Sequence, residues 1–274
     1  MWSVVQIHSS RPLHIVALIL LTNDDGIQAE GLQVLRRSLM DLVTVIVVAP
    51  DRERSAVSHG LTIHDSLTHT QLDESQFSLN GTPADCIIYA LARVIRATPD
   101  LVVSGINCGA NLGDDIMYSG TVAGAREACR RGIPALAVSQ AYDSRPVDFR
   151  RGARFIRLFV KNLLQLKNTG AACLNVNIPV RRIRGVKITR QGCASYFPHF
   201  NALSRASEAG LNIVGGEPPA AVDVPLDYQA VMDNYVSVTP LQRDQTDYAA
   251  VESLLRNAPG LFPRRRMPGL GLIR

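Results

Sequence analysis

Short, continuously apolar runs alternate with segments of helical spacing between residues 14 and 140, and this alternation constrains the fold more than any other feature. The run 14–21 has no polar alternation, which is typical of a parallel strand covered on both faces. A segment with leucines at helical spacing follows it, and then a β-branched run at 43–49. Strand, helix and strand over about 35 residues predict a βαβ unit with a right-handed crossover.

The same alternation continues to residue 140. Thr82 and Pro83 mark a helix start, as N-cap and first helical residue, and we expect that helix to run to about residue 97. The other expected elements are one or two short strands within 61–79, a strand at 101–103, a helix at 121–131 and a strand at 135–139. Repeated βα alternation predicts an α/β fold with a Rossmann-like, mostly parallel sheet flanked by helices.

Beyond residue 140 the pattern is less regular. Helices are expected at 149–166 and 248–256 and strands at 173–178, 186–190 and 235–238, with a turn-rich stretch at 191–234. Long connections in compact domains are commonly functional or involved in assembly, so we predict that this smaller C-terminal part takes part in oligomerisation. The predicted domains are a Rossmann-like metal- and phosphate-binding core at 14–140, a part that completes the core and forms oligomerisation arms at 141–262, and flexible extensions at 1–13 and 263–274.

The formal net charge of +5 does not by itself indicate a nucleic-acid partner. The arginines gather in short clusters, without interleaved aromatic residues and without a recognised nucleic-acid-binding motif. A solvated basic surface is the simpler interpretation, and a positive field also suits a small anionic substrate. We therefore expect no stable nucleic-acid partner.

The apolar run 14–21 superficially resembles the hydrophobic region of a signal peptide. No small-residue cleavage site follows it, and it is too short to span a bilayer. The five cysteines are an odd number with no C-x-x-C spacing, which predicts free thiols in a reducing compartment. We expect a cytoplasmic protein with no membrane partner.

Three polar segments follow predicted strands, at 23–26, 51–60 and 104–121. Ligands of open α/β sheets bind outside the carboxyl ends of the strands, so we expect the three segments to meet there. In the first segment, Asn23 precedes Asp24 and Asp25, whose adjacent carboxylates are costly to hold together without a cation. Mg²⁺, Mn²⁺ or Ca²⁺ would suit these oxygen donors; the alternative is a plain Asp-Gly turn with a carboxylate at a helix start. The apolar run before the pair favours a site.

The segment 104–121 has the composition of a phosphate-binding loop. Gly105 and three further glycines let the backbone approach a ligand, and Asn107 and Asn111 offer side-chain amides. Ser119, Gly120 and Thr121 open a helix, whose free N–H groups suit a phosphate. The alternative is an ordinary glycine-rich loop with a Ser/Thr cap, but its length inside a compact domain favours function.

The segment 51–60 leaves two interpretations open. Ser55 or Ser58 supplies an oxygen to a metal or a phosphate, and His59 acts as a general base, or the segment is a solvated polar connection. Several known motifs are absent from the sequence: G-x-G-x-x-G after the first strand, the P-loop, G-x-S-x-G and H-E-x-x-H.

Taken in order, these segments resemble the successive signatures of the SurE nucleotidases. The matching stretches are L-T-N-D-D-G at 21–26, V-A-P-D-R-E-R-S at 48–55, N-G-T-P-A-D-C at 80–86, P-D-L-V-V-S-G-I-N at 99–107, G-A-N-L-G-D-D-I-M-Y-S-G-T-V at 109–122 and V-S-V-T-P-L at 236–241. Residues 191–220 depart from the family, with only a loose echo of its D-P-R-G and Y-Y-W stretches. That departure concerns substrate preference and subunit exchange rather than the metal site.

The resemblance implies an activity and a set of ligands. It implies 5′- and often 3′-nucleotidase activity on nucleoside monophosphates, sometimes with exopolyphosphatase activity, in a homodimer or homotetramer that exchanges C-terminal elements. It implies a divalent cation, Mg²⁺ or Mn²⁺, held by Asp24, Asp25, Ser55 and Asn107. We accordingly expect Asp24 and Asp25 to be catalytic, and phosphate or substrate to be bound by Asn23, Gly105, Asn111, Ser119, Gly120 and Thr121.

Two other functions remain open at this point. One is a phosphotransfer enzyme of the haloacid-dehalogenase type with Asp24 or Asp25 as nucleophile, although such enzymes usually carry an Asp-x-Asp pair. The other is a non-catalytic regulator that binds a metal and a nucleotide.

Overall fold

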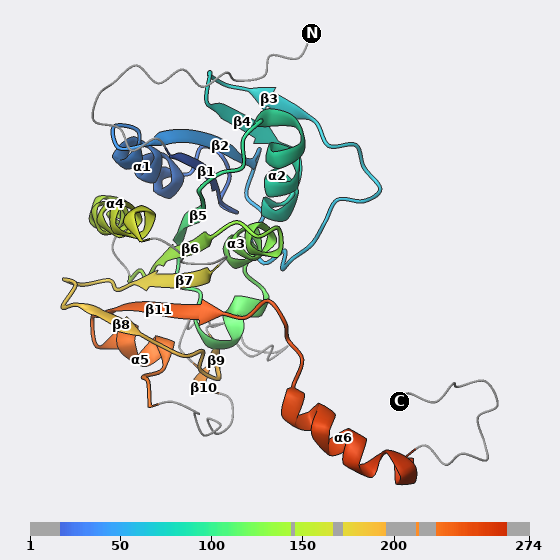
Figure 1. Cartoon of the computed structure of the whole chain (residues 1–274). Helices are drawn as coiled ribbons and strands as arrows, with labels where there is room; N and C mark the ends of the chain where they lie inside the picture. Colours follow the sequence, from blue (N-terminus) through green and yellow to red (C-terminus); the bar gives the residue numbers. More distant parts are fainter. Residues whose placement is uncertain (1–16, 144–145, 167–171, 196–211, 214–222, 262–274) are drawn as a thin grey trace, which may run out of the picture. The chain divides into compact units, whose positions relative to one another are not determined.

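The apolar runs of the N-terminal half become the central strands of a mostly parallel sheet (Figure 1). The computed structural model describes residues 17–143, 146–166, 172–195, 212–213 and 223–261. The central strands, which are parallel to one another, are β2 (Thr44–Pro50), β1 (Leu18–Thr22), β5 (Leu101–Cys108), β6 (Ala135–Gln140) and β7 (Cys173–Ile178). Their parallel order brings their carboxyl ends to one edge of the sheet.

Further strands extend the sheet on both sides. Within the described residues the sheet has nine strands in the order β3-β4-β2-β1-β5-β6-β7-β11-β8. The added strands are β3 (His69–Gln71), β4 (Gln76–Leu79), β11 (Val236–Leu241) and β8 (Val186–Ile188). β3 is antiparallel to β4, and β11 is antiparallel to β7. A separate pair is formed by β9 (Ala194–Ser195) and β10 (Asn212–Ile213).

Helices cover both faces of the sheet (Figure 1). One face packs against α1 (Glu30–Leu39) and α4 (Phe149–Gln165), and the other against α2 (Pro83–Tyr89) and α3 (Gly120–Arg130). The remaining helical segments are η1 (Ala90–Val94), η2 (Gly113–Met117), α5 (Asp227–Met232) and α6 (Tyr248–Leu261).

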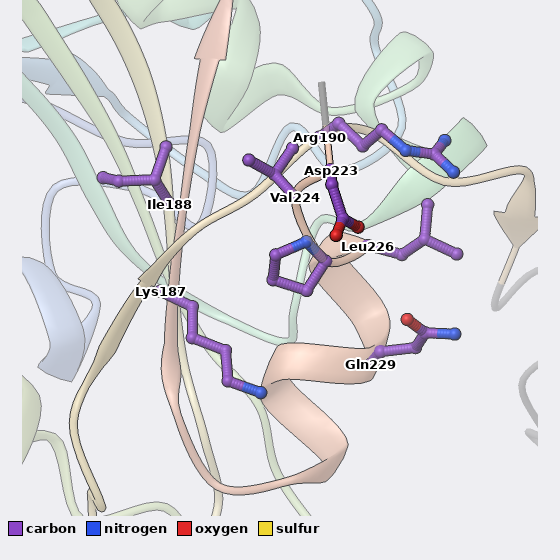
Figure 2. A pocket seen from close by; sticks show the side chains of 8 residues that line it. Lys187, Ile188, Arg190, Asp223, Val224, Leu226 and Gln229 are labelled. Atoms are coloured by element: carbon purple, nitrogen blue, oxygen red, sulfur yellow. The ribbon is translucent and has the colours of Figure 1, made fainter. Parts of the chain in front are cut away.

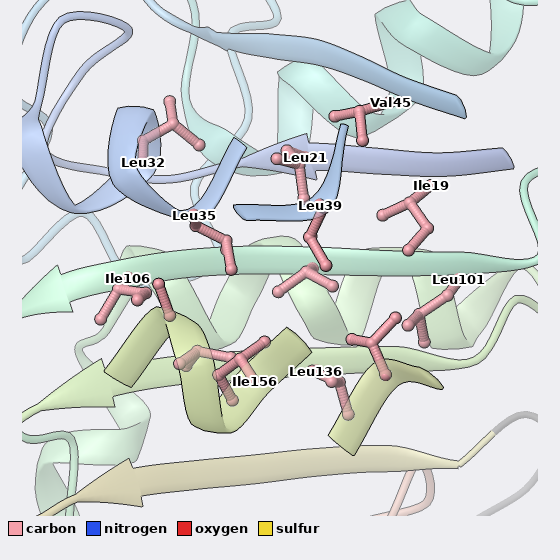
Figure 3. Packing of buried hydrophobic residues seen from close by; sticks show 14 of the residues in the cluster. Ile19, Leu21, Leu32, Leu35, Leu39, Val45, Leu101, Ile106, Leu136 and Ile156 are labelled. Carbon is pink, nitrogen blue, oxygen red and sulfur yellow. The ribbon is translucent and has the colours of Figure 1, made fainter. Parts of the chain in front are cut away.

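Successive residues of β1 pack on opposite faces of the sheet. Ile19 and Leu21 belong to the cluster under α1 and α4, which Figure 3 shows, whereas Leu18 and Leu20 belong to the cluster under α2 and α3. Complete burial of one such side chain contributes about 1.5–3 kcal/mol. The prediction of a strand covered on both faces is confirmed for the described part of the run, and residues 14–16 lie outside the described residues.

Several element boundaries differ from the prediction. The helix that starts at Pro83, with the predicted Thr82 N-cap, changes to π-helical geometry at Ala90 and ends at Val94, three residues earlier than expected. β5 runs to Cys108 instead of stopping at residue 103, because its pairing with β6 resumes after an irregularity between Ser104 and Asn107. The helix α5 lies in a stretch that the sequence predicted only as turn-rich.

The described residues fall into two compact units, the first ending at Leu241 and the second beginning at Gln242. The strands β7 and β11 join the same sheet as β1, so the sheet draws on the chain well beyond residue 140. The second unit contains α6. A search of the described helices for one with the length and apolar character needed to cross a bilayer finds none.

Candidate active site

The three polar segments meet at the carboxyl edge of the sheet, as predicted. The N–H of Arg54 donates to the carbonyl oxygen of Asp24 over 2.7 Å. The N–H of Cys108 donates to Oδ2 of Asp25 over 3.2 Å. The N–H of Ser58 donates to the carbonyl oxygen of Tyr118. Hydrogen bonds donated by main-chain N–H groups therefore hold the loops after β1, β2 and β5 against one another.

Asp24 is buried under the first turn of α3. The hydroxyl of Thr121 donates to Oδ1 of Asp24. Burial raises the pKa of Asp24, while the Thr121 hydroxyl and the N–H groups of Thr121 and Gly120 act in the opposite direction. A Cβ at position 120 would lie 2.8 Å from Oδ2 of Asp24, so only glycine lets the helix start approach so closely.

Asp25 carries an uncompensated negative charge next to Asp24. Burial is the largest cause that raises its pKa, followed by the charge of Asp24 and a smaller contribution from the charge of Glu53, and the net pKa is about 6. The N–H of Cys108 offsets part of this effect. Among the described residues, no arginine or lysine forms an ion pair with either aspartate.

This pair fits a divalent cation. Two carboxylates that repel each other and lack a cationic partner are stabilised when a metal neutralises them. Within the described part of the chain no three or more His, Cys, Asp or Glu side chains are grouped to hold a metal. A cation bound to this pair would therefore take its further protein ligands within the described residues from neutral oxygens, which hard cations such as Mg²⁺ accept.

The two neutral ligands implied by the resemblance lie in the adjoining loops. Ser55 follows Arg54, the residue bound to the Asp24 carbonyl, and its hydroxyl donates to Oε1 of Glu53 over 2.8 Å. Asn107 is half-buried, and its Nδ2 donates to the carbonyl oxygen of Gly109 over 2.8 Å, so Oδ1 is the side-chain atom that would bind a cation. Glu53 was not predicted to matter, although its position two residues before Ser55 is a usable signal.

The structure gives several predicted phosphate-binding residues local roles. The hydroxyl of Ser119 accepts from the N–H of Val122 and so caps α3. Gly105 has a φ of +135°, and a Cβ there would lie 2.2 Å from the Val138 carbonyl oxygen, so this glycine serves the contact of β5 with β6. Nδ2 of Asn23 closes the turn by donating to the Gly26 carbonyl oxygen, whereas its buried Oδ1 has no partner among the described residues.

Asn111 lies in a buried polar network rather than at an open surface. Its Nδ2 donates to the Ser139 hydroxyl over 2.7 Å, and its N–H donates to Oδ1 of Asn177. The amides of Asn175 and Asn177 both donate to its carbonyl oxygen. Asn111 therefore fixes the course of the glycine-rich loop, and its predicted contact with substrate stays a prediction.

His59 faces α3 rather than the aspartates. Its Nε2 lies 3.0 Å from Oε2 of Glu127, which is 2% exposed and also binds Arg130 and Arg131. Glu127 is nearly two helical turns after Thr121, so this contact lies well inside α3. The contact ties the loop after β2 to α3 and offers no support for a general base at position 59.

A residue that sequence reasoning missed holds the glycine-rich loop from the C-terminal part. Asp227, the first residue of α5, is fully buried. Its Oδ2 accepts from the N–H of Gly113 over 2.8 Å, and its Oδ1 accepts from the N–H groups of Gly192 and Tyr228. The position of an aspartate at a helix start is a signal only for capping, so its long-range partner could not be read from the sequence.

A cavity of about 620 Å³ lies elsewhere, between β8 and α5 (Figure 2). Lys187, Arg190 and Gln229 are among the side chains that line it. Four strands lie between β8 and β1 in the sheet, and neighbouring strands are about 4.8 Å apart. The cavity is therefore more than 20 Å from Asp24 by this spacing, and we do not assign the chemistry to it.

Comparison with known proteins identifies relatives along most of the chain. The family model described as "Survival protein SurE" matches residues 19–198. The "5'-nucleotidase SurE" of Geobacter sulfurreducens is 41% identical over 242 residues, which cover 86% of this chain and 92% of that protein. The protein of the same name from Alkaliphilus metalliredigens is 43% identical over 246 residues, covering 86% and 96%.

A solved structure agrees with these matches. The crystal structure of the SurE protein from Aquifex aeolicus superposes with a TM-score of 0.73 at 38% identity, covering 88% of this chain and 99% of that chain. The family model spans well over half of the chain, the two named relatives are more than 40% identical to it, and the solved relative shares its fold. This chain therefore belongs to the SurE family.

Proposed function

We propose that this chain is a metal-dependent phosphomonoesterase that hydrolyses nucleoside 5′-monophosphates to nucleoside and phosphate. The observation that carries the proposal is the adjacent carboxylate pair of the buried Asp24 and the half-buried Asp25, which has no arginine or lysine partner among the described residues and lies beside the start of α3. The name 5′-nucleotidase of the relatives supports the same reaction. Activity on 3′-nucleotides and on polyphosphate, which the family resemblance also implies, belongs to the proposal as secondary activities.

Asp24, Asp25, Ser55 and Asn107 would hold the cation. When bound, a divalent cation polarises a phosphate oxygen and lowers the pKa of water. The protein itself supplies the positioning. Thr121 orients the buried Asp24 carboxylate through its hydroxyl, and the Cys108 N–H orients Asp25.

The start of α3 would stabilise negative charge on the phosphate. The first N–H groups of a helix have no partner within the helix and carry the positive end of its dipole. The Ser119 side chain uses one of these groups, the N–H of Val122, and the N–H groups of Gly120 and Thr121 act on the Asp24 carboxylate, so a phosphate beside Asp24 would share these donors and the positive end of the helix dipole. Hydrogen bonds from fixed N–H groups to the developing charge lower the barrier to hydrolysis because the donors need no reorganisation.

The experiment that tests the proposal is turnover of adenosine 5′-monophosphate by the full chain with Mn²⁺ or Mg²⁺, followed as released phosphate. We expect activity that is lost on chelation and restored by the metal. A chain that binds the metal but releases no phosphate would instead be a regulator. Acid quenching during turnover tests the haloacid-dehalogenase alternative, because a phosphoaspartate would be trapped on Asp24 or Asp25.

We also propose a homo-oligomer, a homodimer or homotetramer, in the cytoplasm. On α6 the side chains of Tyr248, Val251, Leu254 and Leu255 are exposed and recur at helical spacing. Such an apolar stripe on a helix is typical of a face that packs against another surface. None of the five cysteines, all of which lie within the described residues, forms a disulfide, which is compatible with a reducing compartment.

A further inference from the structure

The carboxyl end of β6 places a tyrosine beside the candidate metal site. β6 and β5 stay paired up to Cys108 and Gln140, and the N–H of Gly109 donates to the Gln140 carbonyl oxygen over 3.0 Å. Tyr142 follows two residues later. A Cβ built on Gly109 would lie 3.5 Å from Cε1 of Tyr142 and 3.8 Å from Nδ2 of Asn107. The ring and the metal-ligand candidate therefore approach the same point.

Tyr142 also lines a cavity of about 340 Å³ between the end of β6, the start of α4 and the segment after β7. Side-chain hydrogen bonds fix the walls of this cavity. Gln140, which is 2% exposed, donates to the Asp148 carbonyl oxygen over 2.9 Å, and Arg151 donates to the Pro179 carbonyl oxygen over 3.0 Å. The volume lies in the range of sites that bind small organic molecules.

Tyr142 is 59% exposed, so a ligand can reach its side chain. An exposed aromatic face at a polar edge is a surface on which a flat heterocycle stacks, and stacking of a nucleobase on an aromatic side chain is tolerant of base identity. The residue follows Gln140, the last residue of β6, and Ala141, whose N–H donates to the Ile178 carbonyl oxygen. The platform is therefore held in place before a ligand arrives.

The position of Tyr142 matches the shape of a nucleotide. In a nucleoside monophosphate the base lies across the sugar from the phosphate. With the phosphate at the ends of β1 and β5, the base reaches the next strand end, because neighbouring strands are about 4.8 Å apart. That strand is β6, and its carboxyl end leads into Tyr142.

We propose that Tyr142 and the cavity beside it form the nucleobase subsite, with the base stacked on the Tyr142 ring. This inference rests on the proposed nucleotidase function and adds where the base binds. The other exposed tyrosine near the site, Tyr118, is 50% exposed and precedes Ser119 on the side of the loop after β2. Tyr118 lines neither of the cavities described above. It is therefore the matched comparison.

The test compares a substrate that carries a base with one that lacks it. We would measure kcat/KM with Mn²⁺ for adenosine 5′-monophosphate and for ribose 5-phosphate in the wild type, Tyr142→Ala, Tyr142→Phe and Tyr118→Ala. Tyr142→Ala should lower kcat/KM for the nucleotide roughly 10-fold and leave that for ribose 5-phosphate unchanged, mainly through KM. Tyr142→Phe keeps the ring face and should retain the wild-type ratio of the two values. Tyr118→Ala should also retain that ratio.

Each other outcome overturns the inference in a recognisable way. Equal losses of kcat/KM on both substrates in Tyr142→Ala would assign the residue a structural role. Wild-type kcat/KM on both substrates would show that the base does not bind in this cavity. A base-dependent loss in Tyr118→Ala alone would move the subsite to the opposite side. A wild type with the same kcat/KM for ribose 5-phosphate as for adenosine 5′-monophosphate would contradict the subsite only. A wild type that hydrolyses neither ester would contradict the proposed function and the subsite with it.

Discussion

The hydroxyl of Thr121 donates a hydrogen bond to Oδ1 of Asp24, and this contact joins the first turn of α3 to the carboxyl end of β1. The residues are 97 positions apart in the sequence, and both are buried. The helix that supplies N–H groups to the candidate phosphate site and the strand that supplies the first carboxylate are therefore aligned by one side-chain contact.

Loss of that contact should reduce catalysis more than stability of the fold. Thr121→Ala removes a hydrogen bond to a carboxylate, which contributes about 1.5–3 kcal/mol, so kcat/KM should fall roughly 10-fold or more. Thr121→Ser keeps the hydroxyl and is the matched control. Steady-state kinetics with adenosine 5′-monophosphate and Mn²⁺ test both variants. If Thr121→Ala had wild-type kinetics, capping of α3 would be the only role of this helix start.

Neutralising either aspartate should abolish turnover without unfolding the protein. Asp24→Asn and Asp25→Asn are isosteric, but each removes one of two carboxylates from a hard-cation site. Phosphate release at saturating Mn²⁺ and binding of Mn²⁺ should both fall by orders of magnitude. Asp65→Asn, at an exposed carboxylate, should behave as wild type. Near-normal turnover in either site variant would show that the residue is not an essential ligand.

The raised pKa of Asp25 predicts how stability depends on pH in the metal-free protein. Because folding raises this pKa from 3.8 to about 6, the carboxyl contributes stability below pH 3.8 that is lost as the pH rises through about 6. Asp25→Asn does not titrate. The free energy of unfolding of this variant minus that of the wild type should therefore increase between pH 4 and pH 7, by about 1–3 kcal/mol.

Urea unfolding in the presence of EDTA at pH 4 and pH 7 measures this difference. Mn²⁺ at pH 7 should then stabilise the wild type and have little effect on Asp25→Asn, because bound metal adds stability only where it binds the folded state. A stability difference that is the same at both pH values would mean that Asp25 is not destabilised by its surroundings.

The parts of the site that the sequence predicted are those encoded by local pattern. The apolar run before Asp24 indicates a buried strand, and parallel strands bring their carboxyl ends together, so convergence of the three loops follows from the βα alternation. Likewise, Thr82 and Pro83 are local signals for a helix start, and the structure has that start.

The parts that the sequence could not predict depend on contacts between distant segments. Asp227 binds the N–H of Gly113 across 114 residues, and nothing in the turn-rich surroundings of Asp227 indicates that partner. The extension of β5 to Cys108 depends on pairing with β6 after an irregularity, which hydrophobic periodicity does not register. Roles of single residues, such as Ser119 as a cap, follow from the same tertiary geometry.

Removing the Asp227 carboxylate should destabilise the fold and disturb the glycine-rich loop. Asp227→Ala leaves the N–H groups of Gly113, Gly192 and Tyr228 without this buried acceptor, at a cost of about 3 kcal/mol or more. Asp227→Asn keeps an acceptor oxygen and should lose less. Asp233→Ala removes an exposed carboxylate that is 3.4 Å from Lys187 and should change stability by less than about 0.5 kcal/mol. Equilibrium urea unfolding distinguishes the three variants. Equal free energies of unfolding for Asp227→Ala and Asp233→Ala would mean that the Asp227 carboxylate does not stabilise the glycine-rich loop.

The second unit should carry part of the subunit interface. The chain has a mass of 29.8 kDa, so light scattering of the active full-length protein at micromolar concentration should give at least twice that mass. Leu254→Glu combined with Leu255→Glu places charge on the exposed apolar stripe of α6 and should shift the protein toward the monomer. Arg256→Ala changes an exposed polar side chain of the same helix and should leave the mass unchanged.

The predicted metal ligands all precede residue 140, so we expect Mn²⁺ binding to survive in the double variant. A fully active wild-type monomer of about 30 kDa, or a double variant with the wild-type mass, would contradict the interface, since the stripe would then have no partner to cover it.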